Sequence, residues 1–186
     1  MTQATNGLIT KTPTSVSAIG GTATINADGS VTFSGCTAIG FNGIFDGSTR
    51  YYLINADVLG VTAGDTVHFY YRNAGVADGN VNYKYQVLNV SSTSVSGSRS
   101  TSSNRQYAGR MTNFSGANSG FALYLYDGAV DGQQKRSISK VASGVSGANI
   151  NDYANHYNLT SNADGIHFYS ISNTFSGTIT VFAFNQ

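Results

Sequence analysis

The three histidines are the first residues to test for chemistry, because imidazole is both a general base and a common metal ligand. His68 lies on the polar side of an alternating run, and His156 and His167 each lie in an aromatic stretch. None has a histidine partner at helical spacing or the cysteine and histidine spacing of a zinc site. We therefore expect surface or interface imidazoles rather than metal ligands.

Acidic residues are few, and most of them belong to turns. All nine are aspartates, and six are followed directly by glycine, a pair that suits tight turns. Asp127 and Asp131 offer oxygen atoms to calcium but lack the pattern of known calcium loops. The chain has no glutamate for a glycosidase acid, and Cys36 has no activating neighbour, so we expect a packed thiol. We predict no catalytic residue, no metal, no cofactor and no enzymatic activity.

Aromatic side chains are the remaining candidates for function. The chain contains 12 Tyr and 10 Phe but no Trp. Tyrosine joins an apolar ring to a polar tip, which suits recognition of sugars or proteins. The alternative is that these rings pack under loops or against a partner subunit. The predicted ligand or partner surface consists of Arg105, Tyr107, Tyr124, Tyr126, Tyr153, His156 and Tyr157.

The elements that must position these residues read as strands. Charged residues make up only 10% of the chain, and Ser, Thr, Asn, Gly and Tyr replace the residues that exposed helices favour. Alternating or apolar runs separated by Asp-Gly pairs predict an all-β, antiparallel, two-sheet sandwich of the jelly-roll type, with nine or ten strands and little helix. The predicted strands are 22–26, 30–34, 66–72, 82–90, 121–126, 135–141, 150–159, 166–171 and 178–184.

Alternation also assigns faces, because successive strand side chains point to opposite sides of a sheet. Val67, Phe69 and Tyr71 are predicted to face the core together. In the last strand both faces are apolar, since Phe182 and Phe184 lie opposite the core-facing residues. We therefore predict that Phe182 and Phe184 form a subunit interface.

The chain reads as one domain with a short preceding segment. Residues 1–14 are predicted to be an N-terminal arm or linker, and 15–186 a single sandwich domain. The serine-rich run 96–105 contains two arginines and is predicted to be a flexible loop. The formal net charge is +1 and no long apolar stretch occurs, so we expect neither a nucleic-acid partner nor membrane insertion. The start lacks the features of a signal peptide.

The C-terminal segments carry a recognisable pattern. Residues 163–169 read Ala-Asp-Gly-Ile-His-Phe-Tyr, and 175–185 read Phe-Ser-Gly-Thr-Ile-Thr-Val-Phe-Ala-Phe-Asn. This pattern resembles the end of many tailed-bacteriophage tail proteins, in which an aromatic-Asp-Gly-apolar strand precedes Ser/Thr-Gly-Thr-Ile-x-Val-Tyr-Gly, the last strand of a jelly-roll head domain. Residues 83–86 and 105–110 resemble its middle strands. The departures are Ala163 for an aromatic residue, Phe182 for Tyr and Ala183 for Gly.

The resemblance implies a bacteriophage virion protein, a homotrimer of the tail-fibre, minor-tail or baseplate type, assembled in the host cytoplasm. It names no catalytic residue. Two functions follow as alternatives: a jelly-roll module for assembly and for attachment to a host-surface glycan or protein, or a capsid cement or decoration protein that stabilises the head shell without binding a receptor. A glycan-cleaving enzyme is the least favoured reading.

Overall fold

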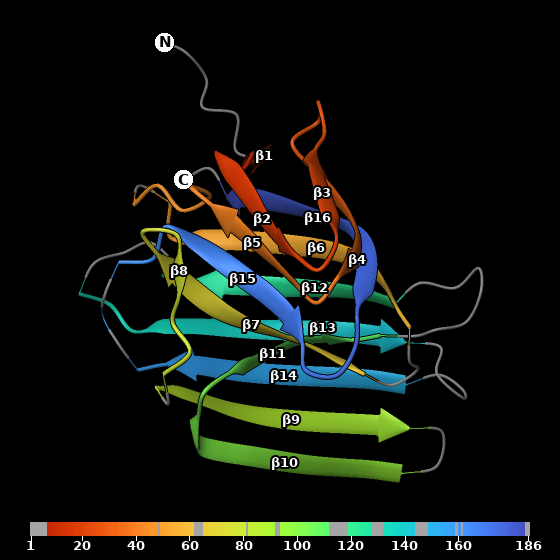
Figure 1. The fold of residues 1–186 in the computed structure, drawn as a ribbon. Helices are drawn as coiled ribbons and strands as arrows, with labels where there is room; N and C mark the ends of the chain where they lie inside the picture. Colours follow the sequence, from red (N-terminus) through yellow and green to blue (C-terminus); the bar gives the residue numbers. More distant parts are fainter. Residues whose placement is uncertain are drawn as a thin grey trace.

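The computed structural model consists of two antiparallel β-sheets packed face to face (Figure 1). It describes residues 7–47, 49–61, 65–80, 82–91, 94–111, 119–127, 132–143, 149–158, 160 and 162–184. Across these ranges the regular structure is entirely β-strand. No helix among the described residues is long and apolar enough to cross a membrane. The predicted all-β sandwich is therefore confirmed.

Sixteen strands are found in the described part of the chain. They are β1 (Leu8–Thr10), β2 (Ser15–Ile19), β3 (Thr22–Ile25), β4 (Val31–Cys36), β5 (Ala38–Asn42), β6 (Tyr51–Gly60), β7 (Thr66–Asn73), β8 (Val76–Ala77), β9 (Tyr83–Ser91), β10 (Ser94–Ser103), β11 (Gln106–Arg110), β12 (Ser119–Tyr126), β13 (Lys135–Ser143), β14 (Asn149–Tyr157), β15 (Gly165–Ser170) and β16 (Phe175–Phe184).

The order of the strands is that of a jelly roll. From β4 to β7 the chain alternates between the two sheets, and the last two strands insert between those already placed. The larger sheet contains β4-β16-β6-β12 in that order, and the smaller sheet contains β5-β15-β7-β11. Each four-strand set interleaves early and late strands, as in the paired Greek keys of jelly rolls. The predicted topology is thereby confirmed.

The larger sheet is much wider than the smaller one. Beyond β12 it continues through β13 and β14 to β9 and β10, which gives ten strands against six. The β9–β10 hairpin is an insertion between β7 and β11 that pairs with β14. Figure 1 shows β9 and β10 extending below the smaller sheet. One face of the larger sheet therefore covers the core, and the opposite face, here called the outer face, is broad and open.

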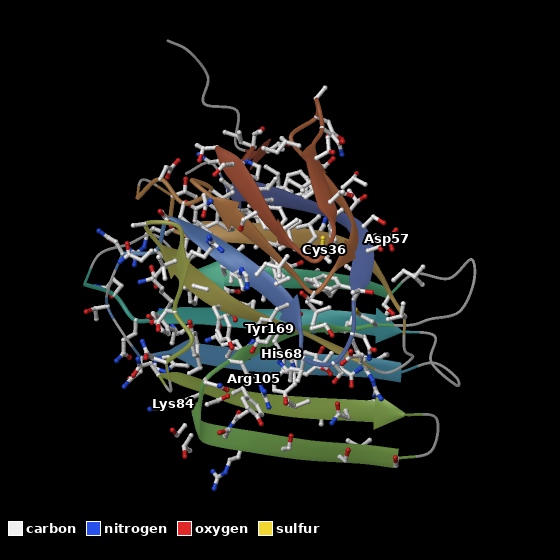
Figure 2. All side chains as sticks on the ribbon, in the orientation of Figure 1. Cys36, Asp57, His68, Lys84, Arg105 and Tyr169 are labelled. Atoms are coloured by element: carbon white, nitrogen blue, oxygen red, sulfur yellow. The ribbon has the colours of Figure 1, made fainter. Side chains whose placement is uncertain are left out.

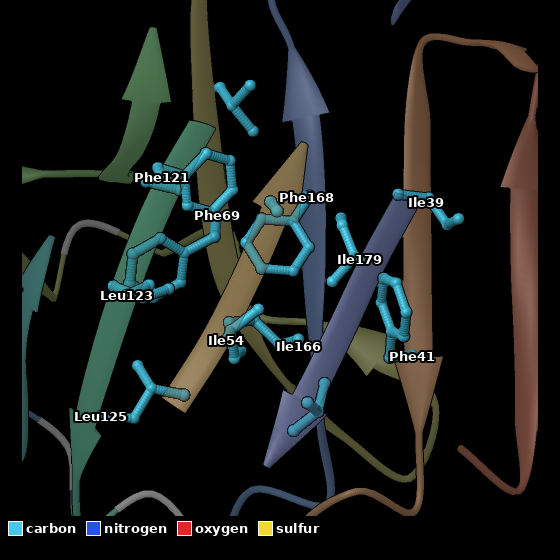
Figure 3. Packing of buried hydrophobic residues seen from close by; sticks show 14 of the residues in the cluster. Ile39, Phe41, Ile54, Phe69, Phe121, Leu123, Leu125, Ile166, Phe168 and Ile179 are labelled. Carbon is cyan, nitrogen blue, oxygen red and sulfur yellow. The ribbon is translucent and has the colours of Figure 1, made fainter. Parts of the chain in front are cut away.

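The core lies between the sheets and follows the predicted alternation. Phe121, Leu123 and Leu125 of β12 are buried, and Phe121 contacts Phe168 of β15 with ring centroids 6.0 Å apart (Figure 3). The predicted inward residues of β7 are also buried. Burial of such aromatic and aliphatic side chains contributes about 1.5–3 kcal/mol each. Cys36 is fully buried, which confirms the packed thiol.

The structure also departs from the sequence-based expectations. All nine predicted strands occur, but seven more accompany them. The run 96–105, predicted to be a flexible loop, lies largely in strand β10, so that prediction is wrong: Ser and Thr suit an exposed edge strand, and β10 pairs with β9. The predicted arm contains β1, because Leu8–Thr10 pair with Phe182–Phe184 of β16.

Candidate functional site

A single row of side chains crosses one end of the outer face. The row consists of neighbours on five adjacent strands: Tyr51, Tyr126, Arg136, His156 and Lys84. Each points outward because the residue next to it in its strand is buried on the core side. We call these five residues the cross-strand row. Figure 2 shows Lys84 at the start of β9, where the row ends.

The cross-strand row lines an open groove of about 810 Å³. Its second side is a parallel row of cross-strand neighbours, Ile138, Ala154, Gln86 and Arg99. The first three lie two residues from Arg136, His156 and Lys84 on the same strands, and Arg99 extends the row onto β10. The same four residues also line a neighbouring hollow of about 580 Å³. The groove thus runs perpendicular to the strands, from β6 to β10, and it is the principal candidate site on the described surface.

The aromatic end of the groove is built by Tyr51 and Tyr126, which are direct cross-strand neighbours. Their ring centroids lie 5.7 Å apart and the ring planes meet at 77°. Such an edge-to-face pair is stabilised by the ring quadrupoles and exposes one ring face and one ring edge. This end therefore offers apolar contact together with two phenolic hydroxyl groups.

A buried carboxylate fixes two arginines beside the tyrosines. Asp127 Oδ1 accepts hydrogen bonds from Arg50 Nε at 2.9 Å and Nη2 at 2.7 Å, and Asp127 Oδ2 accepts one from Arg136 Nη2 at 3.1 Å. Burial acts to raise the pKa of Asp127, but these hydrogen bonds outweigh it, so the pKa lies below its ordinary value. Two cations share one carboxylate, which leaves a net positive charge at this point.

The other cations of the groove are unpaired among the described residues. Lys84 and Arg99 have no acidic side chain of the described chain within ion-pair distance. The groove lining thus holds four cations, Arg50, Lys84, Arg99 and Arg136, against one carboxylate, Asp127.

His156 lies between Arg136 and Lys84 in the cross-strand row. Its Nε2 is 2.9 Å from Gln134 Oε1, and the amide oxygen can only accept, so Nε2 carries a proton. Burial lowers the pKa of His156, and the positive charges of Lys84 and Arg136 lower it further. The imidazole is therefore neutral at pH 7 and serves as a hydrogen-bonding ring.

A second aromatic cluster lies at the edge of the smaller sheet. Tyr107 of β11 stacks on Tyr153 of β14 at 5.2 Å, and it contacts Tyr85 and His68 at 4.7 Å each. The Asn155 side chain holds the backbone of Tyr107 through two hydrogen bonds of 3.1 Å. These contacts hold β11 against the larger sheet and bury His68, so the prediction of a surface or interface imidazole is wrong for this residue.

The predicted ligand surface divides among three places. Tyr126 and His156 lie in the groove, and Tyr124 lies on the same face, outside the groove lining. Tyr107 and Arg105 lie at the edge of the smaller sheet, where Figure 2 shows Arg105 near His68.

Tyr153 and Tyr157 are not at the surface as predicted. Their exposed fractions are 4% and 2%, because the alternation of β14 turns them toward the core. In the predicted strand 150–159 they share one side with Asn151 and Asn155, so the sequence pattern does not show that this side faces the core.

The predicted interface residues lie on the outer face beside the tyrosines. Phe182 pairs with Leu53 and Phe184 with Leu8, and Phe184 remains 36% exposed. Their role as a subunit interface stays a prediction.

Several groove residues escaped sequence analysis. Tyr51 was missed because β6 begins with four apolar residues, Tyr51 to Ile54, which give no alternating signal, and Arg99 was missed because it lies in the presumed loop. Lys84 and Gln86 alternate with the tyrosines of the predicted strand 82–90, but nothing in one sequence aligns them with Arg136 on another strand. Within the described residues, no group of three or more His, Cys, Asp or Glu side chains is arranged to hold a metal ion.

No known protein family and no curated protein matches the chain. Among solved structures, the C-terminal CBM6 of LamC, a marine laminarinase from Zobellia galactanivorans, is similar to it with a TM-score of 0.33 and 12% sequence identity. The match covers 94% of this chain and 98% of that chain. At this level of similarity the comparisons assign no family.

Proposed function

We propose that the protein is a bacteriophage virion component whose jelly-roll domain attaches to a host-surface glycan through the groove on the outer face of the larger sheet. The observation that carries the attachment role is the groove itself, with aromatic rings at one end and exposed polar and cationic side chains along its length. The virion assignment rests on the C-terminal resemblance. The proposed role is binding, not catalysis.

The dimensions of the groove suit an extended ligand. It crosses from β6 to β10, which are five strand spacings apart, or about 24 Å at 4.8 Å per spacing. A linear chain of several sugar units spans such a distance. Tyrosine rings contact the apolar faces of sugars, while Gln86 and the cations supply hydrogen bonds to hydroxyl groups.

The attachment role is tested with an array of bacterial surface polysaccharides and a matched pair of variants. Tyr126 lies in the groove, and Tyr124 lies two residues earlier on the same strand and face but outside the lining. We expect Tyr126→Ala to weaken glycan binding about tenfold or more and Tyr124→Ala to change it little. Equal loss in both variants, or no binding of the native protein to any glycan, would contradict this role.

Virion assembly is the second candidate function. It is favoured by the apolar patch of Leu8, Phe182 and Phe184 beside the groove, because such a patch suits a protein interface. We propose a homotrimer, and sedimentation velocity tests it: Phe184→Ser should shift the protein toward monomer if the patch is the subunit interface. Antibody labelling of phage particles then separates tail from capsid. Labelling at regular capsid positions would favour the decoration role over attachment.

A further inference from the structure

Positive charge is concentrated in the groove far beyond the charge of the whole chain. The lining has four cations and one carboxylate, a net charge of 4 − 1 = +3 with His156 neutral, whereas the whole chain carries +1. The rest of the chain therefore carries a formal net charge of +1 − 3 = −2. A neutral ligand would not require this separation, whereas an anion is attracted by it.

We propose that the ligand of the groove is an extended acidic polysaccharide that bears carboxylate groups, with Lys84, Arg99 and Arg136 binding the carboxylates and the Tyr51–Tyr126 pair contacting the sugar rings. This proposal rests on the proposed function and names the class of glycan. It assigns a role to cations that sequence analysis did not select.

The spacing of the cations matches carboxylates that recur along a chain. Arg136 and Lys84 flank His156 in the cross-strand row, so two strand spacings separate them, or about 10 Å. This distance is close to the length of a disaccharide unit. Arg99 lies on the far side of the groove, on β10, within reach of the same chain.

Arg136 is positioned before a ligand arrives. Asp127 holds Arg136 by a single hydrogen bond to Nη2, and 66% of the Arg136 side chain remains exposed. A guanidinium group has five N–H donors, so several remain to bind a carboxylate. Because Asp127 already restrains the side chain, less conformational entropy is lost on binding.

The geometry favours a carboxylated glycan over other polyanions. Tyr51 and Tyr126 meet edge to face, so they do not form the successive parallel platforms on which nucleic-acid bases stack. Lys84, Arg99 and Arg136 lie on three separate strands instead of converging on one point, as donors around a phosphate do.

The proposal is tested with hyaluronan, which has one carboxylate per disaccharide, and with the carboxyl-reduced form of the same polymer. Binding is measured by biolayer interferometry at low and physiological salt. We expect hyaluronan to bind and the reduced polymer to bind at least tenfold more weakly, with affinity falling as salt screens the exposed charges. Lys84→Gln and Arg99→Gln should each weaken binding about five- to tenfold.

The matched control is Lys140→Gln. Lys140 lies on the same face and the same strand as Arg136 but outside the groove, where it pairs with Asp152. Lys140→Gln removes one positive charge, as Lys84→Gln and Arg99→Gln do. If Lys140→Gln binds hyaluronan with unchanged affinity, the weaker binding of the other two variants results from their place in the groove and not from the change in net charge. Equal losses in all three variants would overturn the proposal.

Other outcomes overturn the proposal in different ways. Equal binding of hyaluronan and its reduced form, sensitive only to Tyr126→Ala, would leave the attachment function intact and refute the acidic ligand. Stronger binding of polyphosphate or of a thymidine oligonucleotide than of hyaluronan would show that the groove recognises phosphate and not carboxylate. Absence of binding to hyaluronan, with retained binding to neutral polysaccharides on the array, refutes this inference alone, whereas absence on both refutes the proposed function as well.

Discussion

Tyr107 of β11 and Tyr153 of β14 stack with their ring planes only 3° from parallel, although they belong to different sheets. The ten-stranded sheet is wider than its partner, so β11 is the last strand to cover it. The stacked pair closes the core at this boundary, and Tyr153 is 4% exposed. This position explains why Tyr153, which was expected to bind a ligand, has a structural role.

Truncation of the stacked pair should reduce stability unequally. We expect Tyr153→Ala to lower the free energy of unfolding by about 3–5 kcal/mol, because a buried ring is lost. Tyr107→Ala should cost less, since its ring is half-buried. Urea unfolding of both single variants and the double variant gives the coupling free energy between the two rings, which we expect to be about 0.5–1.5 kcal/mol. Additive single effects would show that the stack contributes nothing beyond burial.

The buried His68 and the partly buried His167 should make the protein sensitive to mild acid. Burial lowers the pKa of His68 and of His167 to about 4, with the charges of Arg105 and Arg72, respectively, acting in the same direction. Arg72 Nη1 is 3.0 Å from His167 Nδ1, and because arginine only donates, Nδ1 must accept and remain unprotonated. Asp65 near His68 opposes the shift only weakly.

The sign of the effect follows from the lowered pKa values. In the unfolded chain both imidazoles bind protons below about pH 6.5, whereas in the folded protein they do so only near pH 4. Stability is therefore lost as the pH falls between these values. We expect urea unfolding midpoints to fall steadily from pH 7 to pH 4.5. His167→Gln keeps an acceptor for Arg72 but cannot titrate, so this variant should lose less stability over the same range. NMR titration midpoints near 6.5 for both imidazoles would contradict the prediction.

Gly165 should tolerate no side chain, although its backbone is not left-handed. A Cβ at Gly165 would lie 2.0 Å from the carbonyl oxygen of Phe41 on the neighbouring strand. Gly165→Ala should therefore force the strands apart and destabilise the protein by several kcal/mol, or prevent folding. The control is Gly47→Ala. At Gly47 φ is +75°, but an added Cβ would have no atom of a residue beyond its chain neighbours within 4 Å, so only about 1 kcal/mol of backbone strain is expected. Thermal unfolding of both variants compares them, and similar losses would refute the steric account.

The contrast between Gly165 and Gly29 shows what Asp-Gly pairs reveal about this fold. Asp28-Gly29 joins β3 to β4 as predicted, with Gly29 at φ +83° and its N–H donating to Asn26 O. Asn26 N–H also donates to Ser30 O, which closes a three-residue loop. Of the loop residues only Gly29 is left-handed, whereas a two-residue type I′ turn needs two such residues. In Asp164-Gly165 the glycine instead begins a strand and permits close strand packing. The sequence locates the Asp-Gly pairs, but the packing of the neighbouring strand determines whether each pair forms a turn or begins a strand.

Alternation predicted the buried faces well because it is a local property of a strand. Val67, Phe69 and Tyr71 are buried as expected. The groove was not predictable in the same way, since Tyr51 and Lys84 meet in one row only through the pairing of five strands. That register depends on long-range contacts, to which a single sequence gives no direct access.

The Asp127 carboxylate should stabilise the end of the groove more than any exposed ion pair on the same face. Its side chain is 3% exposed and binds both Arg50 and Arg136, and its backbone is left-handed at φ +58°. Asp127→Asn tolerates this backbone conformation but removes the charge, so we expect a loss of about 1–3 kcal/mol at pH 7. Asp127→Ala should lose about 1 kcal/mol more through backbone strain.

The matched control for this prediction is Asp152→Asn. Asp152 pairs with Lys140 on the same face, but their side chains are 41% and 63% exposed, so the loss should stay below about 1 kcal/mol. The lowered pKa of Asp127 also sets a pH signature: its contribution is present above the ordinary pKa and disappears as the pH falls through the folded value. The difference between the native protein and Asp127→Asn, measured by urea unfolding, should therefore shrink below about pH 4. A difference that is independent of pH would mean that shape, not charge, is what Asp127 contributes.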